Sequence, residues 1–448
     1  MKSTTLFPFF SLLLSAFFLQ QASAEELDLP TPAPWPSPQH IEVYIHEPSK
    51  VAPENVHEEG SNELEELEEL KELEEDQELT ALKTPQTSED PFPLAADLGL
   101  SADLMLIRPR PAALLTTTRS EISPRLNLKV TEDLSFTLRV NFLDGGVDRH
   151  AGGSSPKGEI LTEQAFLRWT IESWSSKIYS YQVERGLKVG LQLLPIGLIN
   201  PQSLPDSYMT VVPPEVETYI IPRRWSEMGA VYEAQHQQLG AGFTYRLGLF
   251  NSLDAGKLRP DSYLSRGVQG GNGKAQDPSL IAGLEFQDEN FRFGGSYLYG
   301  HTGHSLEGLG FSPLHLYEVH LKAGLGRLSF TGLFAEAHLL DAEAIQVVNN
   351  TSTFGKKARG YYLNLALDLL HNSSHRSWPL FVRFEHYNLH YEVPPGESSD
   401  PLLKRTNINY GMNYSPHPQL IFKFDYQDRK NALEPEPGIF SLGLSFIY

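Results

Sequence analysis

Apolar and polar residues alternate one by one along many short segments of this chain, and this period of two restricts the fold more than any other sequence feature. In residues 134–142 (LSFTLRVNF), Phe136, Leu138 and Val140 fall on one side of an extended chain, and Thr137 and Arg139 on the other. The same alternation recurs in residues 241–250, 407–414 and 420–427. Successive side chains of a β-strand point to opposite faces, so such a segment separates apolar surroundings from water. The pattern predicts an all-β protein.

The connections between these segments decide between a soluble sandwich and a membrane barrel. The short links are residues 131–133, 237–240, 288–290 and 415–418, and the long ones are 143–160, 195–226, 251–279, 301–314, 339–357, 392–404 and 429–437. Tight turns at one end and long loops at the other are typical of outer-membrane barrels, whereas a sandwich has no reason to gather its long loops at one end. We therefore predict a transmembrane antiparallel β-barrel of about 16 strands in residues 96–448.

The individual strands follow from the alternation and the turn residues. They are predicted at 104–116, 121–130, 134–142, 161–170, 186–194, 227–236, 241–250, 280–287, 291–300, 315–324, 327–338, 358–369, 380–391, 405–414, 419–428 and 438–448. An even number of strands places both ends of the barrel on the periplasmic side.

The chain ends in an apolar, alternating segment (GIFSLGLSFIY), although most chain ends are polar and frayed. Phe440, Leu442, Leu444 and Phe446 lie on one face, and Tyr448 is the final residue. We expect a last strand that pairs with the first, with its apolar face toward lipid and its aromatic end in the interfacial girdle. The segment also resembles the terminal signature by which the outer-membrane assembly machinery recognises its clients.

The residues before the barrel differ in composition. Residues 1–24 contain a lysine, an apolar run and an Ala-Ser-Ala end, which predicts a secretory signal peptide. Residues 25–95 are rich in proline and acid, and they carry most of the net charge of −20. The barrel region is nearly neutral, so nothing favours nucleic-acid binding. The chain has no cysteine, which excludes disulfides and a lipidated N-terminal cysteine.

Within the acidic part, leucines recur at every third residue, at Leu64, Leu67, Leu70 and Leu73. A three-residue step rotates steadily around a helix, so these leucines form no lasting seam. We expect a disordered or partly helical tether in the periplasm. A short oligomerising helix and a partner-binding segment are the alternatives.

Basic residues on the polar face of the predicted strands are candidates to line a pore. They are Arg139, Arg168, Lys188, Arg246, Lys322, Arg383 and Lys423, opposed by Glu318, Asp368, Glu385 and Asp425. Rings of basic side chains favour anions in a pore, so a weak preference for anions is one interpretation. The other is that these residues only solvate the lumen and pair across strands.

The connection at 195–226 is unusually rich in apolar residues, aromatic residues and proline for a solvated loop. A segment carrying Tyr208, Tyr219 and Trp225 needs a surface on which to pack. If it folds into the barrel mouth, Arg223 and Arg224 become candidate constriction charges. The alternative is a lid packed on the outer rim or on a neighbouring subunit.

Three stretches resemble a known family. LKVGLQLLPIGLIN (187–200), PPEVETYIIPRRWSEMG (213–229) and YRLGLFNSLDA (245–255) are similar to bacterial outer-membrane porins related to the phosphate-selective porin O and P family. The resemblance implies a sixteen-stranded, often trimeric porin with an inward-folded loop after the fifth strand. Arg223 and Arg224 stand where small hydroxylated residues are usual, and no dense ladder of basic residues is present. Phosphate preference therefore does not carry over.

Two rival functions are a lipid hydrolase and a structural or adhesive barrel with a blocked lumen. His301, His304 and Ser305 could supply hydrolase chemistry or a His-x-x-His metal site, but they lie in a glycine-rich predicted loop and no third ligand is specified. His371 and His375 fall in a predicted turn. A blocked barrel fits the sequence as well as an open one, because the lumen width depends on the strand number.

The sequence thus predicts an outer-membrane porin that passes small hydrophilic solutes passively, without catalytic residues, a metal or a cofactor. The expected partners are outer-membrane lipid and lipopolysaccharide, the barrel-assembly machinery, small hydrophilic solutes and two further copies in a homo-trimer. No nucleic acid is expected.

Overall fold

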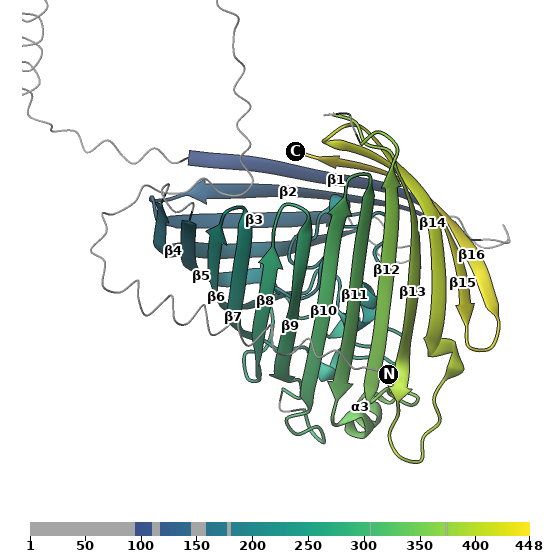
Figure 1. Ribbon diagram of the computed structural model, residues 1–448. Coiled ribbons are helices and arrows are strands. Elements are labelled where there is room, and N and C mark those ends of the chain that lie inside the picture. The colour runs from purple at the N-terminus through teal and green to yellow at the C-terminus, as the bar shows by residue number, and fades with distance from the viewer. Residues whose placement is uncertain are drawn as a thin grey trace, which may run out of the picture. The chain divides into compact units, whose positions relative to one another are not determined.

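The computed structural model describes residues 95–109, 117–144, 158–176, 181–304, 306–371, 373 and 375–448, and they form a closed antiparallel β-barrel of sixteen strands (Figure 1). The strands are β1 (Ala95–Pro109), β2 (Thr117–Lys129), β3 (Leu134–Leu143), β4 (Glu159–Ser176), β5 (Tyr181–Leu193), β6 (Ser226–Gln238), β7 (Ala241–Asn251), β8 (Pro278–Gln287), β9 (Phe291–His301), β10 (Pro313–Leu325), β11 (Leu328–Leu339), β12 (Lys357–Asp368), β13 (Pro379–Glu392), β14 (Lys404–His417), β15 (Leu420–Asn431) and β16 (Pro435–Ile447). Each pairs with its neighbours in sequence. The predicted fold class is confirmed for the barrel. The predicted signal peptide and acidic segment lie outside the described residues.

The last strand closes the barrel on the first. Leu444 and Leu442 of β16 pair with Leu104 and Leu106 of β1. Hydrogen bonds from the backbone N–H of Tyr448 to the carbonyl of Leu100 (2.7 Å) and back (2.9 Å) extend the pairing to the last residue. Because every strand then has two neighbours, the sheet has no free edge. The prediction made from the C-terminal alternation is confirmed.

Some strand ends differ from the prediction. The connection expected to be long at 429–437 is a tight turn of residues 432–434, because the Asn431 side chain accepts hydrogen bonds from the N–H groups of Leu433 and Glu434 and closes the hairpin. The first strand covers residues 95–109 and not 104–116. The fourth and fifth strands are longer than expected, which leaves only residues 177–180 between them.

The connections between β7 and β8, β9 and β10, β11 and β12, and β13 and β14 gather at one end of the barrel, and helix α3 (Ala342–Asn349) lies there among them (Figure 1). The helix ends at Asn350, whose left-handed backbone (φ 47°) lets its N–H reach the carbonyls of Gln346 and Val347. Within the described part of the chain, none of the helices has the length and apolar character needed to cross a membrane.

The strand register separates an apolar outer face from a polar inner one. One row across β9 to β14 consists of Phe293, Leu321, Gly332, Leu363, Phe384 and Ile408. The adjacent row, one residue along each strand, consists of Arg292, Lys322, Thr331, Asn364, Arg383 and Asn409. Neighbouring residues of a strand face opposite sides, so the first row lies outside the barrel and the second inside. In the first row, Leu363 and Phe384 are 45% and 36% exposed.

Candidate pore

Charged side chains of both signs line the inner face of β4 to β10 and neutralise one another. Glu233 lies between Lys188 at 3.1 Å and Arg246 at 2.7 Å. Arg168 pairs with Glu184 on the neighbouring strand. These ion pairs join adjacent strands. They agree with the interpretation that the basic residues of the inner face pair across strands.

The connection between β5 and β6, residues 194–225, folds into the barrel. Its apolar side chains pack against inward-facing residues of the wall strands and form a dry cluster. The buried members from the loop are Leu194, Ile196, Leu198, Val216, Ile220, Ile221 and Trp225, and those from the wall include Val231, Phe250, Ile281, Leu298, Leu316, Leu333, Ala335 and Tyr362. Every one of these residues is at most 3% exposed. The alternative of a lid on the outer rim is therefore wrong for this loop.

Glu217 fastens two parts of the loop to each other and to the wall. One oxygen of its carboxylate accepts hydrogen bonds from the N–H groups of Leu198 and Ile199, both at 2.9 Å. The other accepts a 2.6 Å bond from the hydroxyl of Tyr362 on β12. Burial raises the pKa of Glu217, while the bonds from Tyr362 and from the Ile199 N–H lower it. Three donors at one buried carboxylate make it a strong anchor.

The far side of the loop is held by the opposite wall. Lys423 of β15 donates to the backbone carbonyls of Pro205, of Tyr208 at 2.8 Å and of Thr210 at 3.3 Å. Asp425, two residues further along β15, accepts a 2.7 Å bond from the N–H of Val211. The loop begins at β5, ends at β6 and is also held by β15, so it crosses the lumen.

Strand β13 adds two further ties. Arg383 donates to the hydroxyl of Thr210 at 2.7 Å, and Glu385 accepts from the N–H of Val216 at 2.8 Å. The side chains of Arg383 and Glu385 are 2% and 0% exposed, and they lie 3.8 Å apart. Arg383 and Glu385 therefore each bind the loop, and they also lie close enough to attract each other.

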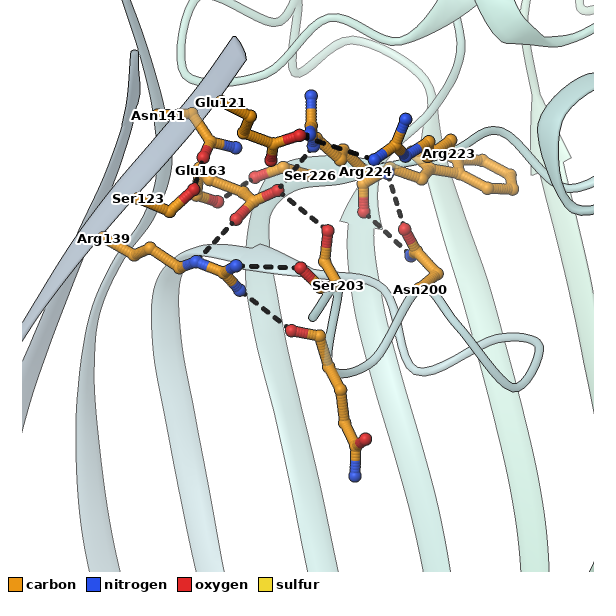
Figure 2. A network of polar contacts seen from close by, with 12 residues as sticks. Glu121, Ser123, Arg139, Asn141, Glu163, Asn200, Ser203, Arg223, Arg224 and Ser226 are labelled. Atoms are coloured by element: carbon orange, nitrogen blue, oxygen red, sulfur yellow. Dashed lines mark hydrogen bonds and ion pairs between the residues drawn. The ribbon is translucent and has the colours of Figure 1, made fainter. Parts of the chain in front are cut away.

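A third cluster fixes the loop near β2, β3 and β4 (Figure 2). Arg139 pairs with Glu163 at 3.0 Å and donates to the carbonyls of Gln202 and Ser203, both at 2.8 Å. Figure 2 shows Glu163 between the Arg139 guanidinium and the Ser203 hydroxyl, which donates to it at 3.1 Å. Positioned in this way, Glu163 joins the barrel wall to the middle of the loop.

The two candidate constriction charges belong to the same cluster. Arg224 pairs with Glu121 of β2 and lies 3.5 Å from Glu163. Arg223 lies 3.5 Å from Glu121 and 3.5 Å from the hydroxyl of Tyr208. Burial lowers the pKa of Arg224 to about 10, and the charge of Asp103 opposes this effect. Both arginines therefore attach the loop to the wall, and their role in conduction stays a prediction.

Of the nine cations predicted to line the pore, eight are held by carboxylates or by oxygen atoms of the loop. These eight are Arg139, Arg168, Lys188, Arg223, Arg224, Arg246, Arg383 and Lys423. The side chain of Lys322, by contrast, has no ion pair or hydrogen bond with the residues that the structure describes.

Lys322 lines a cavity of about 470 Å³ inside the barrel, on the side of the loop that faces the short turns. The loop contributes Gln202, Asp206 and Tyr208 to it, and the tight turn at 288–290 lies at its edge. Asn364 adds a buried side-chain oxygen with no hydrogen-bond partner among the described residues.

Sequence reasoning missed the acidic residues that hold the loop, namely Glu121, Glu163 and Glu217, together with Tyr362. The only signal for Glu217 is that it is one of two carboxylates, with Glu215, in the otherwise apolar stretch PPEVETYII (213–221). A buried acid needs donors, but the alternation does not tell which strands supply them.

Of the residues considered for catalysis in the loop after β9, the structure describes the two histidines, and they have different surroundings. His304 is 3% exposed, and its ring nitrogen Nε2 lies 3.0 Å from the carbonyl of Leu253 and 3.0 Å from the amide of Gln269. Ser305 lies outside the described residues. His301 bonds Tyr299 at 2.9 Å on the other face of the wall. Across the described ranges, His, Cys, Asp and Glu form no group of three that could hold a metal ion.

Comparison with known proteins gives one curated relative and several solved barrels. No family model matches the chain. An uncharacterized protein of Aquifex aeolicus is 24% identical over 330 residues, which cover 71% of this chain and 72% of that protein. Among solved structures, OmpT of Vibrio cholerae with loop L8 deleted, an outer membrane protein, has 10% identity and a TM-score of 0.48, covering 79% of this chain and 99% of that one. The anion-selective porin of Comamonas acidovorans has 11% identity and a TM-score of 0.45, with 79% and 100% covered.

Proposed function

We propose that this chain forms an outer-membrane channel of the porin type, through which small hydrophilic solutes diffuse passively. The observation that carries the proposal is the wall itself, where an apolar outer row lies beside a polar inner row in a sheet without free edges. A closed sheet satisfies all its backbone groups, which is the condition for lying in lipid. At about sixteen strands a barrel leaves an aqueous interior. The resemblance of residues 187–200, 213–229 and 245–255 to porins supports the same function.

In this proposal the loop at 194–225 is the constriction. It reaches β2, β12, β13 and β15, so solutes pass through the spaces between its backbone and the wall. A weak preference for anions belongs to the proposal as well. It depends mainly on Lys322, because the other candidate cations are neutralised or hydrogen-bonded by the protein.

A second function is a structural barrel with a closed lumen, and the apolar cluster favours it. The cluster fills the space between the loop and β6 to β13 with side chains that are nearly inaccessible to water. Such a plug can stop ions altogether if the remaining spaces are too narrow.

Recordings from a planar bilayer distinguish the two functions. Folded, purified protein should give stepwise ionic conductance, and heat-unfolded protein at the same detergent concentration is the control. A folded barrel that stays electrically silent contradicts the channel and favours the closed barrel. The reversal potential in a salt gradient tests selectivity separately, and a cation-selective value contradicts the preference for anions.

The surroundings of the barrel follow from the same proposal. We expect outer-membrane insertion through the assembly machinery, contact with lipid and lipopolysaccharide, a homo-trimer, and residues 25–95 in the periplasm. Chemical cross-linking of outer-membrane preparations should give a ladder that ends at three copies. Added protease should reach residues 25–95 only after the outer membrane is opened, and cleavage in intact cells contradicts the periplasmic location.

A further inference from the structure

A groove of about 1400 Å³ crosses the wall over β14, β15, β16, β1 and β2. Figure 1 shows that the wall turns there, from the upright strands β10 to β12 to β1 and β2, which run crosswise. Five neighbouring strands span about 19 Å at roughly 4.8 Å per strand spacing, which is the length scale of an extended fatty acyl chain. The floor is a row of cross-strand neighbours that consists of Met412, Phe424, Leu442, Leu106 and Thr118.

The groove lies on the outer face of the wall and not in the lumen. Leu104 and Leu442, which line it, are 54% and 47% exposed. On the inner side of the same strands the loop covers the wall, since Val211 packs against Gly443 and Lys423 donates to the loop carbonyls. In the proposed channel this outer face meets lipid, so the groove is filled from the membrane.

A lipid chain fits this groove better than a second copy of the barrel does. The outer wall of another barrel bulges away from its own lumen and cannot enter a recess in this one. A flexible acyl chain follows the recess and contacts its apolar side chains along the whole length. In the middle of the groove, Phe422, Phe424, Leu442 and Leu106 carry no hydrogen-bonding group, which agrees with a hydrocarbon occupant.

The two ends of the groove differ in chemistry. Trp378 and Tyr414 lie at the end toward the short turns, with their rings edge to face and the centroids 6.3 Å apart. Thr118 and Ser120, near the start of β2, bring hydroxyl groups to the end toward the long loops. A lipid that lies with its chain in the groove and its headgroup at the long loops therefore meets polar side chains only where its own polar part begins.

An arginine of the outer face borders the groove on the side of the long loops. Arg108 follows Leu106 by two residues on β1 and lies opposite Phe440 of β16, and its side chain is exposed. Within the described part of the chain it has no ion pair and no hydrogen bond. A charge on the lipid-facing side of a barrel is unfavourable, and arginine binds phosphate through several donors at once. Arg108 thus calls for the phosphate of a lipid.

The other charged residues around the groove leave this role to Arg108. Arg119 and Lys423 alternate with residues of the outer face and belong to the inner one. Asp144 follows β3, two strands away from β1, and its carboxylate accepts the N–H of Ser120 at 3.0 Å. The anion that Arg108 lacks is therefore not supplied by these neighbours.

We propose that the groove holds an acyl chain of lipopolysaccharide and that Arg108 binds a phosphate of the same molecule. The proposed channel places the long loops outside the cell, and lipopolysaccharide is the phosphorylated lipid of that leaflet. Arg376, near the opposite end, lies in the turn between β12 and β13, where water solvates it. A phospholipid of the inner leaflet is therefore less favoured. This inference rests on the proposed outer-membrane location and assigns a site to the lipid expected there.

The test uses the folded full-length chain in detergent, with deep-rough lipopolysaccharide as the probe and phosphatidylglycerol as the second phosphorylated lipid. Native mass spectrometry measures the lipid that is retained. We expect Arg108→Met to weaken lipopolysaccharide binding by about tenfold or more, since a hydrogen bond to a charged group is worth at least about that factor. Leu442→Trp, which fills the groove, should weaken it similarly. The matched controls Arg376→Met and Leu280→Trp, the second on the outer face of β8, should bind like the parent chain.

Three results overturn the proposal. One is equal binding of lipopolysaccharide by the parent chain, Arg108→Met and Leu442→Trp. Another is retention of phosphatidylglycerol alone, or a loss of binding in Arg376→Met, which places the headgroup at the opposite end. The third is a changed number of copies in Leu442→Trp with lipid binding intact, which makes the groove a contact between copies. Lipid binding does not depend on conduction. A silent barrel that binds lipopolysaccharide contradicts only the channel, and a conducting barrel that does not bind it contradicts only the groove.

Discussion

The hydroxyl of Tyr362, on β12, donates a 2.6 Å hydrogen bond to the carboxylate of Glu217, in the loop that crosses the barrel. The second oxygen of the same carboxylate receives the N–H groups of Leu198 and Ile199 from the other limb of the loop. One buried side chain thus joins both limbs to the wall. Together with the ties to β13 and β15, this contact makes the loop a fixed element and not a flexible lid.

Replacing Glu217 should loosen the loop without opening the barrel. Glu217→Gln removes the negative charge and leaves only one strong acceptor for three donors. We expect hydrogen exchange at the amides of Leu198 and Ile199 to speed up by at least about tenfold, because a bond to a charged group contributes roughly 1.5–3 kcal/mol. Mass spectrometry of the exchanged peptides measures it. Tyr362→Phe removes one of the three donors and should have a smaller effect, so an equal or larger effect contradicts the anchoring role of Glu217.

Two lysines of the inner face should differ in their importance for the loop. Lys423→Met leaves the carbonyls of Pro205, Tyr208 and Thr210 without their donor, and unsatisfied buried groups cost about 1–3 kcal/mol each. Trypsin cleavage after Arg223 and Arg224 requires local opening of the loop, so the cleavage rate reports this loss. The rate should rise in Lys423→Met. The control is Lys322→Met, which also removes a lysine of the inner face but one without a hydrogen bond to the loop, and trypsin should cleave it at the rate of the parent chain. Similar cleavage rates in the two variants contradict the prediction.

The two neighbouring arginines of the loop should also behave differently. The side chain of Arg224 is 15% exposed and lies between Glu121 and Glu163, whereas that of Arg223 is 24% exposed. Removing one partner of a buried pair costs about 3–5 kcal/mol. Arg224→Gln should therefore lower the midpoint of the heat-dependent gel shift of the barrel more than Arg223→Gln does. The opposite order places Arg223, and not Arg224, at the structural contact.

Removing a side chain from the apolar cluster should change the conductance of the barrel. Ile220→Ala removes a side chain that is 0% exposed, and such changes cost about 2–5 kcal/mol. In bilayer recordings the conductance of this variant should rise or become noisier, because the loop packs less firmly on the wall. Val212→Ala alters a residue of the same loop that is 39% exposed and should leave the conductance unchanged. If both variants conduct like the parent chain, the cluster does not govern the constriction.

Much of the barrel could be predicted from the sequence because its strands follow a local rule. Phe440 to Phe446 alternate so regularly that they predict the closing strand without reference to its partner, and the structure pairs this strand with β1. The rule was less informative where turn chemistry decides. At Asn431 a single side chain closes a tight hairpin inside a stretch that was expected to be a long loop.

The sequence by itself determined the period of two, the number of strands and the apolar character of residues 194–225, since each depends on neighbouring residues alone. Only the tertiary structure decided what the inward-facing charges do. Arg383 and Lys423 look alike in sequence to Lys322, yet the first two hold the loop and the third faces an open cavity. The difference arises because the loop crosses the lumen and brings its carbonyl and hydroxyl groups to some strands and not to others. A charge acquires its role from the partner that the fold places beside it, and that partner can lie more than a hundred residues away along the chain.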